Sequence, residues 1–110
     1  MSTKLSKIEI EKFSRQIILK NIGALGQKKI REAKVLIIGM GGLGCPAAEF
    51  LTRSGIGTLG IVDYDKVSLS NIHRQTLYTE KNVNKSKVKI AKKKLNEINP
   101  KTKINIFNYK

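Results

Sequence analysis

Short apolar runs predict three β-strands. Residues 35–38 form a continuous, largely β-branched run, as in a strand that is buried on both faces of a sheet. Residues 59–63 form a second short run, which closes on an acidic residue. Further along, Ile104 and Ile106 alternate with polar residues, as expected of a third strand.

Two segments between these strands have the composition and spacing of helices. Residues 46–51 contain good helix formers, Pro46 is tolerated in the first turn of a helix, and Gly55 is a suitable C-terminal cap. A second helix is predicted from about Ser86, and Asn99 with Pro100 ends it. Its apolar residues recur at helical spacing: Val88, Ala91, Leu95 and Ile98.

The segment before the first strand is also predicted to be helical. Residues 8–19 roughly follow helical spacing, and Gly23 and Gly26 are expected to break that helix. Residues 27–33 then form a second short helix that leads into the first strand.

The order strand, helix, strand, helix, strand is one βαβαβ unit. Such a unit is the mononucleotide-binding half of a doubly wound parallel sheet, so the predicted fold class is α/β and Rossmann-like, preceded by N-terminal helices. The 110 residues suffice for one core, and no repeat or linker divides them. We therefore interpret residues 1–110 as one nucleotide-binding domain, and we expect it to be the N-terminal portion of a larger one.

Charge and hydropathy narrow the classes of partner. The formal net charge of +14 is typical of nucleic-acid binding, but lysine supplies most of it. The lysines of residues 81–103 have no interleaved aromatic residues, so we interpret them as a solvated helix face and expect no nucleic-acid partner.

No apolar run approaches the ~20 residues that span a bilayer, and the first residues lack the apolar stretch of a signal peptide. We expect a cytoplasmic protein without a membrane partner.

A glycine-rich loop follows the first predicted strand and precedes a predicted helix. Gly39 permits a tight turn, and Gly44 allows the helix to pack closely on the strand. Gly41 and Gly42 let the backbone come close to a nucleotide, and the helix N-terminus favours an anion. A glycine pattern alone is a weak signal, but the flanking strand and helix make this loop a candidate phosphate site.

An acidic residue follows the second predicted strand. Asp63 lies 19 residues after Gly44, close to the ~20 residues at which such folds place an acid on the ribose hydroxyls. The loop and the acid together predict a nucleotide with a free ribose diol. Asp65 lies two positions later, and we interpret it as a cap of the turn at Ser68 or Ser70.

Lysines gather where a helix does not favour them. Lys85, Lys87 and Lys89 lie at the start of the last predicted helix, where the helix dipole disfavours positive charge. Such a break of a local preference often marks function, because a lysine there can reach phosphates at the neighbouring loop. The alternative is that a lysine-rich composition places lysines everywhere, and the pattern alone does not decide between the two.

Polar residues also follow the second strand. Asn71, Arg74 and Gln75 lie at the carboxyl edge, where open α/β sheets bind ligands. An arginine there suits a triphosphate, and the alternative for Arg74 is a surface ion pair with Glu80.

The cysteine and the histidine carry no strong functional signal. Cys45 is the single cysteine, so it forms no internal disulfide, and we interpret it as a small buried thiol. His73 is the single histidine and is a poor candidate for a metal ligand or general base. We expect no metal site within these residues.

Several segments together resemble the ThiF/MoeB adenylyltransferases, whose pattern the catalytic subunits of ubiquitin-activating enzymes share. The resemblance runs in register from about Phe13 to the C-terminus, and residues 62–75 are its most specific part. The segments that carry it are FSRQIIL from Phe13, GQ from Gly26, VLIIGMGGLGC from Val35, GIGTLGIVDYDKVSLSNIHRQTLY from Gly55, KSK from Lys85 and NP from Asn99.

The resemblance implies an enzyme that uses ATP and Mg²⁺ to activate the C-terminal glycine carboxylate of a ubiquitin-like sulfur-carrier protein as an acyl adenylate, with release of pyrophosphate. It implies that the loop around Gly42 packs against the nucleotide and that Asp63 holds the ribose. Arg15 would reach the triphosphate from the other subunit of a dimer. The residues that would bind phosphates are Asn71, Arg74 and Lys87.

The resemblance leaves alternatives open. Family members continue with an aspartate that binds Mg²⁺ and often with paired cysteines for zinc, so we expect the metal ligand outside this chain. A longer gene product, one part of a split enzyme and a truncated, non-catalytic binding module all fit the sequence. An NAD-dependent Rossmann oxidoreductase is the enzymatic alternative, since the glycine loop and Asp63 suit NAD equally. Arg74 and Lys87 argue against it, because a dinucleotide has no triphosphate tail to neutralise.

Overall fold

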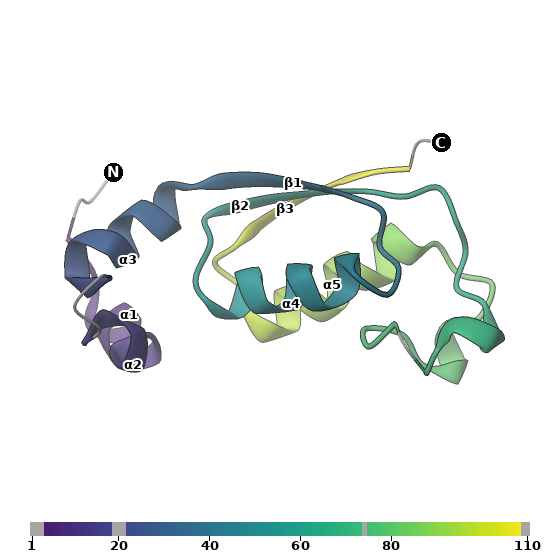
Figure 1. Ribbon diagram of the computed structural model, residues 1–110, viewed down its shortest axis with the longest axis horizontal. Coiled ribbons are helices and arrows are strands. Elements are labelled where there is room, and N and C mark those ends of the chain that lie inside the picture. Colours follow the sequence, from purple (N-terminus) through teal and green to yellow (C-terminus); the bar gives the residue numbers. More distant parts are fainter. Residues whose placement is uncertain (1–3, 19–21, 74, 109–110) are drawn as a thin grey trace.

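The centre of the molecule is a parallel sheet of three strands. The computed structural model describes residues 4–18, 22–73 and 75–108. The strands β1 (Lys34–Ile38), β2 (Thr58–Val62) and β3 (Lys103–Phe107) lie in the order β1-β2-β3 (Figure 1). Because all three strands run in the same direction, their carboxyl ends meet at one edge of the sheet. The predicted α/β class and βαβαβ order are confirmed.

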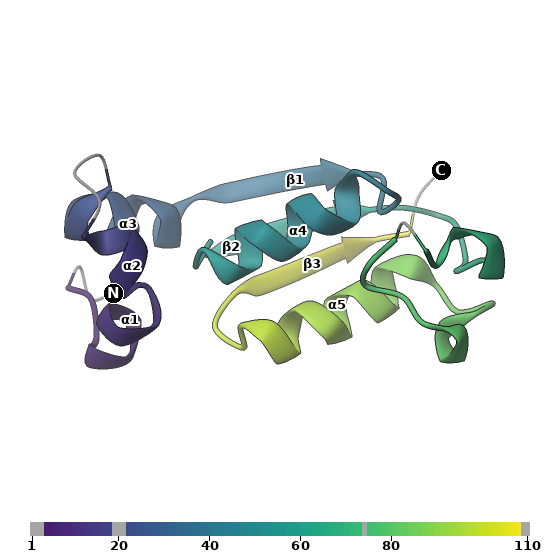
Figure 2. The ribbon, with the colours of Figure 1, turned by 60° about the horizontal axis from the view of Figure 1, so that its bottom comes forward.

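Two helices connect the strands and pack on the same face of the sheet. Helix α4 (Gly44–Arg53) follows β1, and helix α5 (Lys87–Ile98) precedes β3. Both lie beneath the sheet in Figure 1 and next to each other in Figure 2. Both predicted helices are confirmed. The core between them and the sheet includes the fully buried residues Ala48, Leu59, Ile61, Val88, Ala91 and Leu95.

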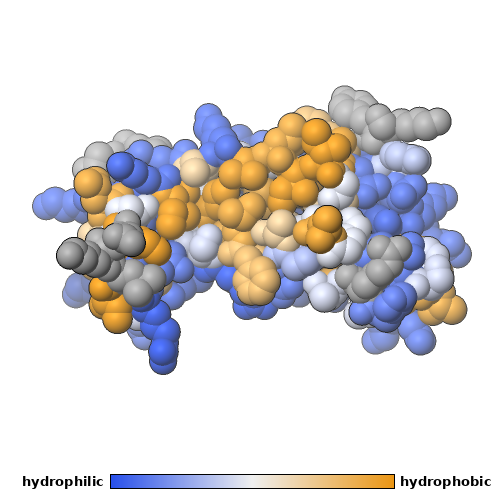
Figure 3. Space-filling model, in the orientation of Figure 1, coloured by the Kyte–Doolittle hydropathy of each residue, from blue (hydrophilic) through white to orange (hydrophobic). Residues whose placement is uncertain are grey.

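The opposite face of the sheet is bare in the part of the chain that the structure describes. Leu36 and Ile38 of β1 are 57% and 81% exposed, whereas Val35 and Ile37 pack against the core. Figure 3 shows a hydrophobic area across the middle of the molecule, over the strands and α4. The prediction that residues 35–38 are buried on both faces is therefore wrong, because none of the described segments forms a second layer over the outer side of β1.

Three short helices precede the sheet: α1 (Lys7–Lys12), α2 (Ser14–Ile17) and α3 (Gly23–Glu32). The single helix predicted over residues 8–19 is wrong, because the chain turns at Phe13, whose buried ring packs beside Gly55. Residue 19 lies outside the described residues. Gly23 starts α3 and Gly26 lies within it, so neither breaks a helix as predicted. The short helix predicted over residues 27–33 is the second part of α3.

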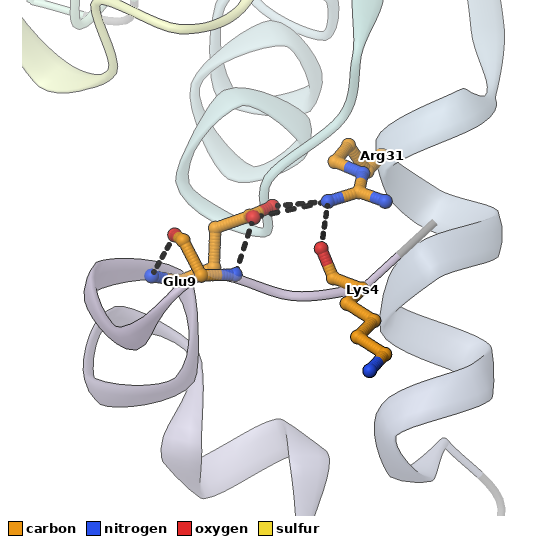
Figure 4. A network of polar contacts seen from close by, with 4 residues as sticks. Lys4, Glu9 and Arg31 are labelled. Carbon is orange, nitrogen blue, oxygen red and sulfur yellow. Dashed lines mark hydrogen bonds and ion pairs between the residues drawn. The ribbon is translucent and has the colours of Figure 1, made fainter. Parts of the chain in front are cut away.

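An acidic residue ties α1 to α3. Glu9 accepts the backbone N–H of Ser6 at 3.0 Å, which closes the N-terminus of α1, and it pairs with Arg31 at 3.0 Å (Figure 4). The Ser6 N–H and, to a smaller extent, the Arg31 guanidinium hold the pKa of Glu9 below its ordinary value.

Two glutamines attach the N-terminal helices to the end of α4. Gln16 and Gln27 each donate a side-chain N–H to the carbonyl oxygen of Ser54, at 2.8 Å and 2.9 Å. Gln27 is 1% exposed, so these hydrogen bonds satisfy a buried amide. The two helices are therefore an integral part of the packed structure.

A long connection between β2 and α5 contains two 3-10 turns, η1 (Leu69–Asn71) and η2 (Glu80–Asn82). Val67, Leu77 and Tyr78 from this connection are buried in the core. Within the described ranges, none of the helices has the length and apolar character needed to cross a membrane.

Candidate functional site

The candidate site lies at the carboxyl edge of the sheet, where the glycine loop joins β1 to α4. Gly39 has a φ of +94°, a backbone conformation that residues with a side chain rarely adopt. A Cβ atom at Gly44 would lie 1.9 Å from the carbonyl oxygen of Gly39, so only glycine allows α4 to begin so close to the turn. The tight turn and the close packing that were predicted for these two glycines are both present.

The loop leaves room for a ligand at Gly41. A Cβ atom built there would meet a single atom within 4 Å, the Nε2 of Gln75 at 3.8 Å. The space directly beside the Gly41 Cα, where a side chain would begin, is therefore uncrowded. Phosphate binding at Gly41 and Gly42 stays a prediction.

Asp63 follows β2 directly, and its carboxylate is joined to the glycine loop. Its Oδ2 accepts the backbone N–H of Met40 at 2.7 Å, and its Oδ1 accepts the backbone N–H of Asp65 at 2.8 Å. Each carboxylate oxygen has a further lone pair. Asp63 can therefore accept ribose hydroxyl groups while it holds the loop.

The carbonyl group of Met40 is held by two buried side chains. Tyr78 donates its hydroxyl to this oxygen at 3.0 Å, and the Sγ of Cys45 lies 3.2 Å from it. Burial raises the pKa of the Tyr78 hydroxyl and of the Cys45 thiol, so both stay protonated and donate at neutral pH. The buried thiol predicted at Cys45 is confirmed. Sequence reasoning missed Tyr78, because no local pattern links it to a residue 38 positions away.

Lys87 differs from the other two lysines near the start of α5 because it is buried. It is only 4% exposed, whereas Lys85 and Lys89 are exposed. A buried lysine is unusual, because an ammonium group loses hydration when it leaves water. The structure therefore favours a specific role for Lys87 over a general lysine-rich surface.

Asp65 contacts Lys87 through both its main chain and its side chain. The backbone N–H of Lys87 donates to the backbone carbonyl oxygen of Asp65 at 3.1 Å. The side-chain Nζ of Lys87 lies 3.9 Å from Asp65 Oδ2. Asp65 was predicted to cap a turn at Ser68 or Ser70, but the hydroxyls of those serines lie 3.0 Å from each other. The structure corrects this prediction, since the Asp65 carboxylate faces Lys87.

The connection after η1 brings further polar groups to the same edge. The carbonyl oxygen of Asn71 accepts the N–H of Gln75 at 3.1 Å. Gln75 is 2% exposed, and its Oε1 is buried without a hydrogen-bond partner in the described part of the chain. His73 is exposed. Arg74 lies outside the described residues, so its contact with phosphate stays a prediction.

Arg15 is not part of this site within one chain. It is exposed on α2, which lies at the end of the molecule opposite to the carboxyl edge of the sheet (Figures 1 and 2). The molecule is 42 Å long. A contact between Arg15 and the nucleotide would therefore require a second chain.

The assembled groups suit a phosphorylated nucleoside. The glycine backbone offers close approach, Asp63 offers acceptors for a ribose, and Lys87 offers a cation for phosphate. No cluster of three or more His, Cys, Asp or Glu within the described ranges could hold a metal ion.

The sequence is similar to known adenylyltransferases. The profile of the ThiF family matches residues 13–110. The chain is 48% identical over 104 residues to the adenylyltransferase and sulfurtransferase MOCS3 of Drosophila willistoni. This match covers 94% of the chain and 23% of the relative, so the chain spans about a quarter of the relative's length.

Solved structures share the same arrangement. PaaA superposes with a TM-score of 0.87 at 39% identity, over 98% of this chain and 36% of PaaA. The E. coli tRNA N6-threonylcarbamoyladenosine dehydratase TcdA, solved in complex with ATP, superposes with a TM-score of 0.83 at 25% identity, over 94% of this chain and 42% of TcdA. The family profile, the sequence identity and the shared fold agree with one another. The chain therefore belongs to the ThiF family.

Proposed function

We propose that this chain is the nucleotide-binding part of an adenylyltransferase that uses ATP to activate the C-terminal glycine of a ubiquitin-like sulfur-carrier protein. One observation carries the proposal: Asp63 is hydrogen-bonded to the glycine loop at Met40 and, through Asp65, connected to the buried Lys87. These contacts support the proposal, in which Asp63 is the ribose acceptor, the glycine loop binds phosphate and Lys87 is the cation. Since the chain spans 23% of the MOCS3 relative, we propose the complete activity for a larger assembly.

In this proposal the protein acts by positioning and by neutralising charge. The carboxylate of the carrier attacks the α-phosphorus of ATP, and the bond from that phosphorus to pyrophosphate breaks as the acyl–phosphate bond forms. Lys87 and Arg74 neutralise the departing pyrophosphate, the Asn71 amide donates a hydrogen bond to a phosphate oxygen, and Asp63 fixes the nucleoside. Mg²⁺ bound to the phosphates adds further charge neutralisation when it is present.

The proposed assembly is a dimer or a pair of complementing chains. The position of α2 at the far end of the molecule supports a role for Arg15 in the site of a second chain. We also propose a cytoplasmic location, which the sequence predicts.

A chimeric enzyme tests the proposed activity. This chain would replace the matching 104-residue segment of the Drosophila willistoni relative, with which it is 48% identical, and ATP–pyrophosphate exchange would be measured with and without the carrier protein. We expect exchange that requires the carrier. A Lys87→Met chimera should lose exchange, and a Lys89→Met chimera should keep it, because Lys89 is exposed. A folded chimera without exchange would contradict the proposal.

Mixing two inactive chimeras tests the role of Arg15. Arg15→Ala should abolish exchange without changing the unfolding midpoint, since the side chain is exposed. Mixing it with the Lys87→Met chimera should restore part of the activity, because hybrid dimers contain one intact composite site. If mixing restores nothing, Arg15 does not act across a subunit interface.

A further inference from the structure

The ammonium group of Lys87 has an unusual environment. The side chain of Lys87 is 6% exposed, whereas the Asp65 carboxylate that faces it at 3.9 Å is 53% exposed. Removing an ammonium from water is unfavourable unless an opposite charge compensates. Asp65 supplies that charge, and it does so from a position that solvent reaches.

The main chain of Asp65 is fixed, while its carboxylate is free to turn towards solvent. Its N–H donates to Asp63 at 2.8 Å, and its carbonyl oxygen accepts the N–H of Lys87 at 3.1 Å. The next residues continue this attachment, because Lys66 forms an antiparallel bridge with Ser86. These backbone contacts hold the start of α5 beside Asp63 whether or not the Asp65 carboxylate points at Lys87.

The contact between the two charged groups is also a weak one. Charge-assisted N–H···O hydrogen bonds are about 2.7–2.9 Å long, so a separation of 3.9 Å is an ion pair without a hydrogen bond. A phosphate chain offers several anionic oxygens, which can approach the ammonium to hydrogen-bonding distance. Phosphate is therefore the better partner for Lys87, and the Asp65 carboxylate repels the same phosphates.

We infer that Asp65 is the resident counterion of Lys87 and that a nucleoside triphosphate exchanges it for phosphate oxygens. This inference rests on the proposed function, since the exchange requires ATP at the glycine loop. Asp65 is then a positioning residue with two opposite effects. It stabilises the protein without nucleotide, because it compensates a buried charge, and it weakens the binding of ATP, because it competes for Lys87.

An Asp65→Asn variant separates these effects. Asparagine keeps the size of the side chain and leaves all the backbone contacts in place. We expect the unfolding midpoint without nucleotide to fall and the affinity for ATP to rise about two- to fivefold, the range set by exposed ion pairs. The affinity for adenosine should not change, because adenosine has no phosphate to meet Lys87. Calorimetric titration with ATP and adenosine and thermal unfolding of the 110-residue chain measure all three quantities.

Two matched controls isolate the role of Lys87. Glu97→Gln removes the same charge from an exposed position on α5, so it reports the effect of net charge on ATP binding. In a Lys87→Met background the loss of stability from Asp65→Asn should disappear, and the gain in ATP affinity should shrink. This double-mutant cycle measures the coupling between the two residues.

The outcomes are distinct. The exchange is supported if Asp65→Asn binds ATP more tightly and is less stable. Both effects should depend on Lys87, and neither should appear in Glu97→Gln. If the unaltered chain binds ATP and Asp65→Asn binds it equally or more weakly, the exchange is overturned while the proposed function stands. If the unaltered chain binds no ATP, the proposed function and the exchange are both overturned.

Discussion

The backbone nitrogen of Met40 lies 2.7 Å from Oδ2 of Asp63, so the acid that follows β2 is hydrogen-bonded to the loop that follows β1. Hydrogen bonds to charged groups contribute about 1.5–3 kcal/mol each. Asp63 is thus part of the loop's architecture as well as a candidate ribose ligand. The same side chain links the stability of the protein to its ability to bind a nucleotide.

Removing Asp63 should therefore damage both properties. We expect Asp63→Ala to lower the free energy of unfolding and to weaken ATP binding, each by about 1–3 kcal/mol, because two backbone N–H groups and the ribose lose an acceptor. Denaturant unfolding and calorimetry measure the two effects. Unchanged ATP affinity in a destabilised variant would show that Asp63 is structural only.

Two glycines in one loop should respond differently to the same methyl group. Gly44→Ala places a Cβ atom 1.9 Å from the Gly39 carbonyl oxygen, so we expect a loss of about 1–3 kcal/mol of stability from overpacking. Gly41→Ala meets only an ordinary contact at 3.8 Å. Gly41→Ala should change the free energy of unfolding by less than about 1 kcal/mol. It should still weaken ATP binding by about tenfold or more, since the methyl group lies where the phosphates come close to the backbone. Equal ATP affinity in Gly41→Ala and the unaltered chain would place the phosphates elsewhere.

The attachment of the N-terminal helices should depend on pH through Glu9. Its pKa is lowered from 4.5 in the folded protein, mainly by the Ser6 N–H and then by Arg31. A lowered pKa means that the stabilisation is complete above the unfolded-state value and is lost as the pH falls through the folded-state value. Glu9→Gln keeps an acceptor for the Ser6 N–H but loses the charge, so it should cost up to about 1 kcal/mol at pH 7 and remove this part of the acid sensitivity. Glu11→Gln, at an exposed position of the same helix, is the control; identical pH profiles for the two variants would contradict this role of Glu9.

The bare face of the sheet should make the chain self-associate. Leu36 and Ile38 expose apolar side chains, and β1 is an edge strand of the described sheet. Ile38→Thr keeps a β-branched residue and removes apolar surface, so it should reduce association measured by light scattering without lowering stability. Leu25→Gln, which removes an exposed apolar group from α3, should have less effect. A chain that is monomeric at all concentrations would contradict this prediction.

The parts of the fold that depend on local chemistry were predictable from the sequence. The glycine loop, the strand that ends at Asp63 and the helix stopped by Asn99 all carry local signals of turn, strand and cap. The unusual position of Lys87 was visible too, because three lysines lay where a helix disfavours them. Only the structure distinguished Lys87 from its exposed neighbours, since burial depends on the connection that packs over it.

The incorrect predictions share a different physical origin. The run at residues 35–38 indicated a strand covered on both faces, but coverage depends on a second layer that these residues do not encode. The turn at Phe13 follows from its packing beside Gly55, more than 40 positions away. The roles of Tyr78 and Asp65 likewise arise from long-range contacts, which a single sequence does not display.

Calorimetric titration of the 110-residue chain with ATP and Mg²⁺, and separately with NAD, tests the proposed nucleotide specificity most directly. Asp63 can bind the ribose of either nucleotide, and the glycine loop allows the phosphates of either to come close. The difference in affinity between ATP and NAD therefore measures the contribution of the cations that bind a triphosphate. We expect tighter binding of ATP than of NAD, and a Lys87→Met variant should lose that preference. Tighter binding of NAD would contradict the proposed function and would favour a dinucleotide-dependent oxidoreductase.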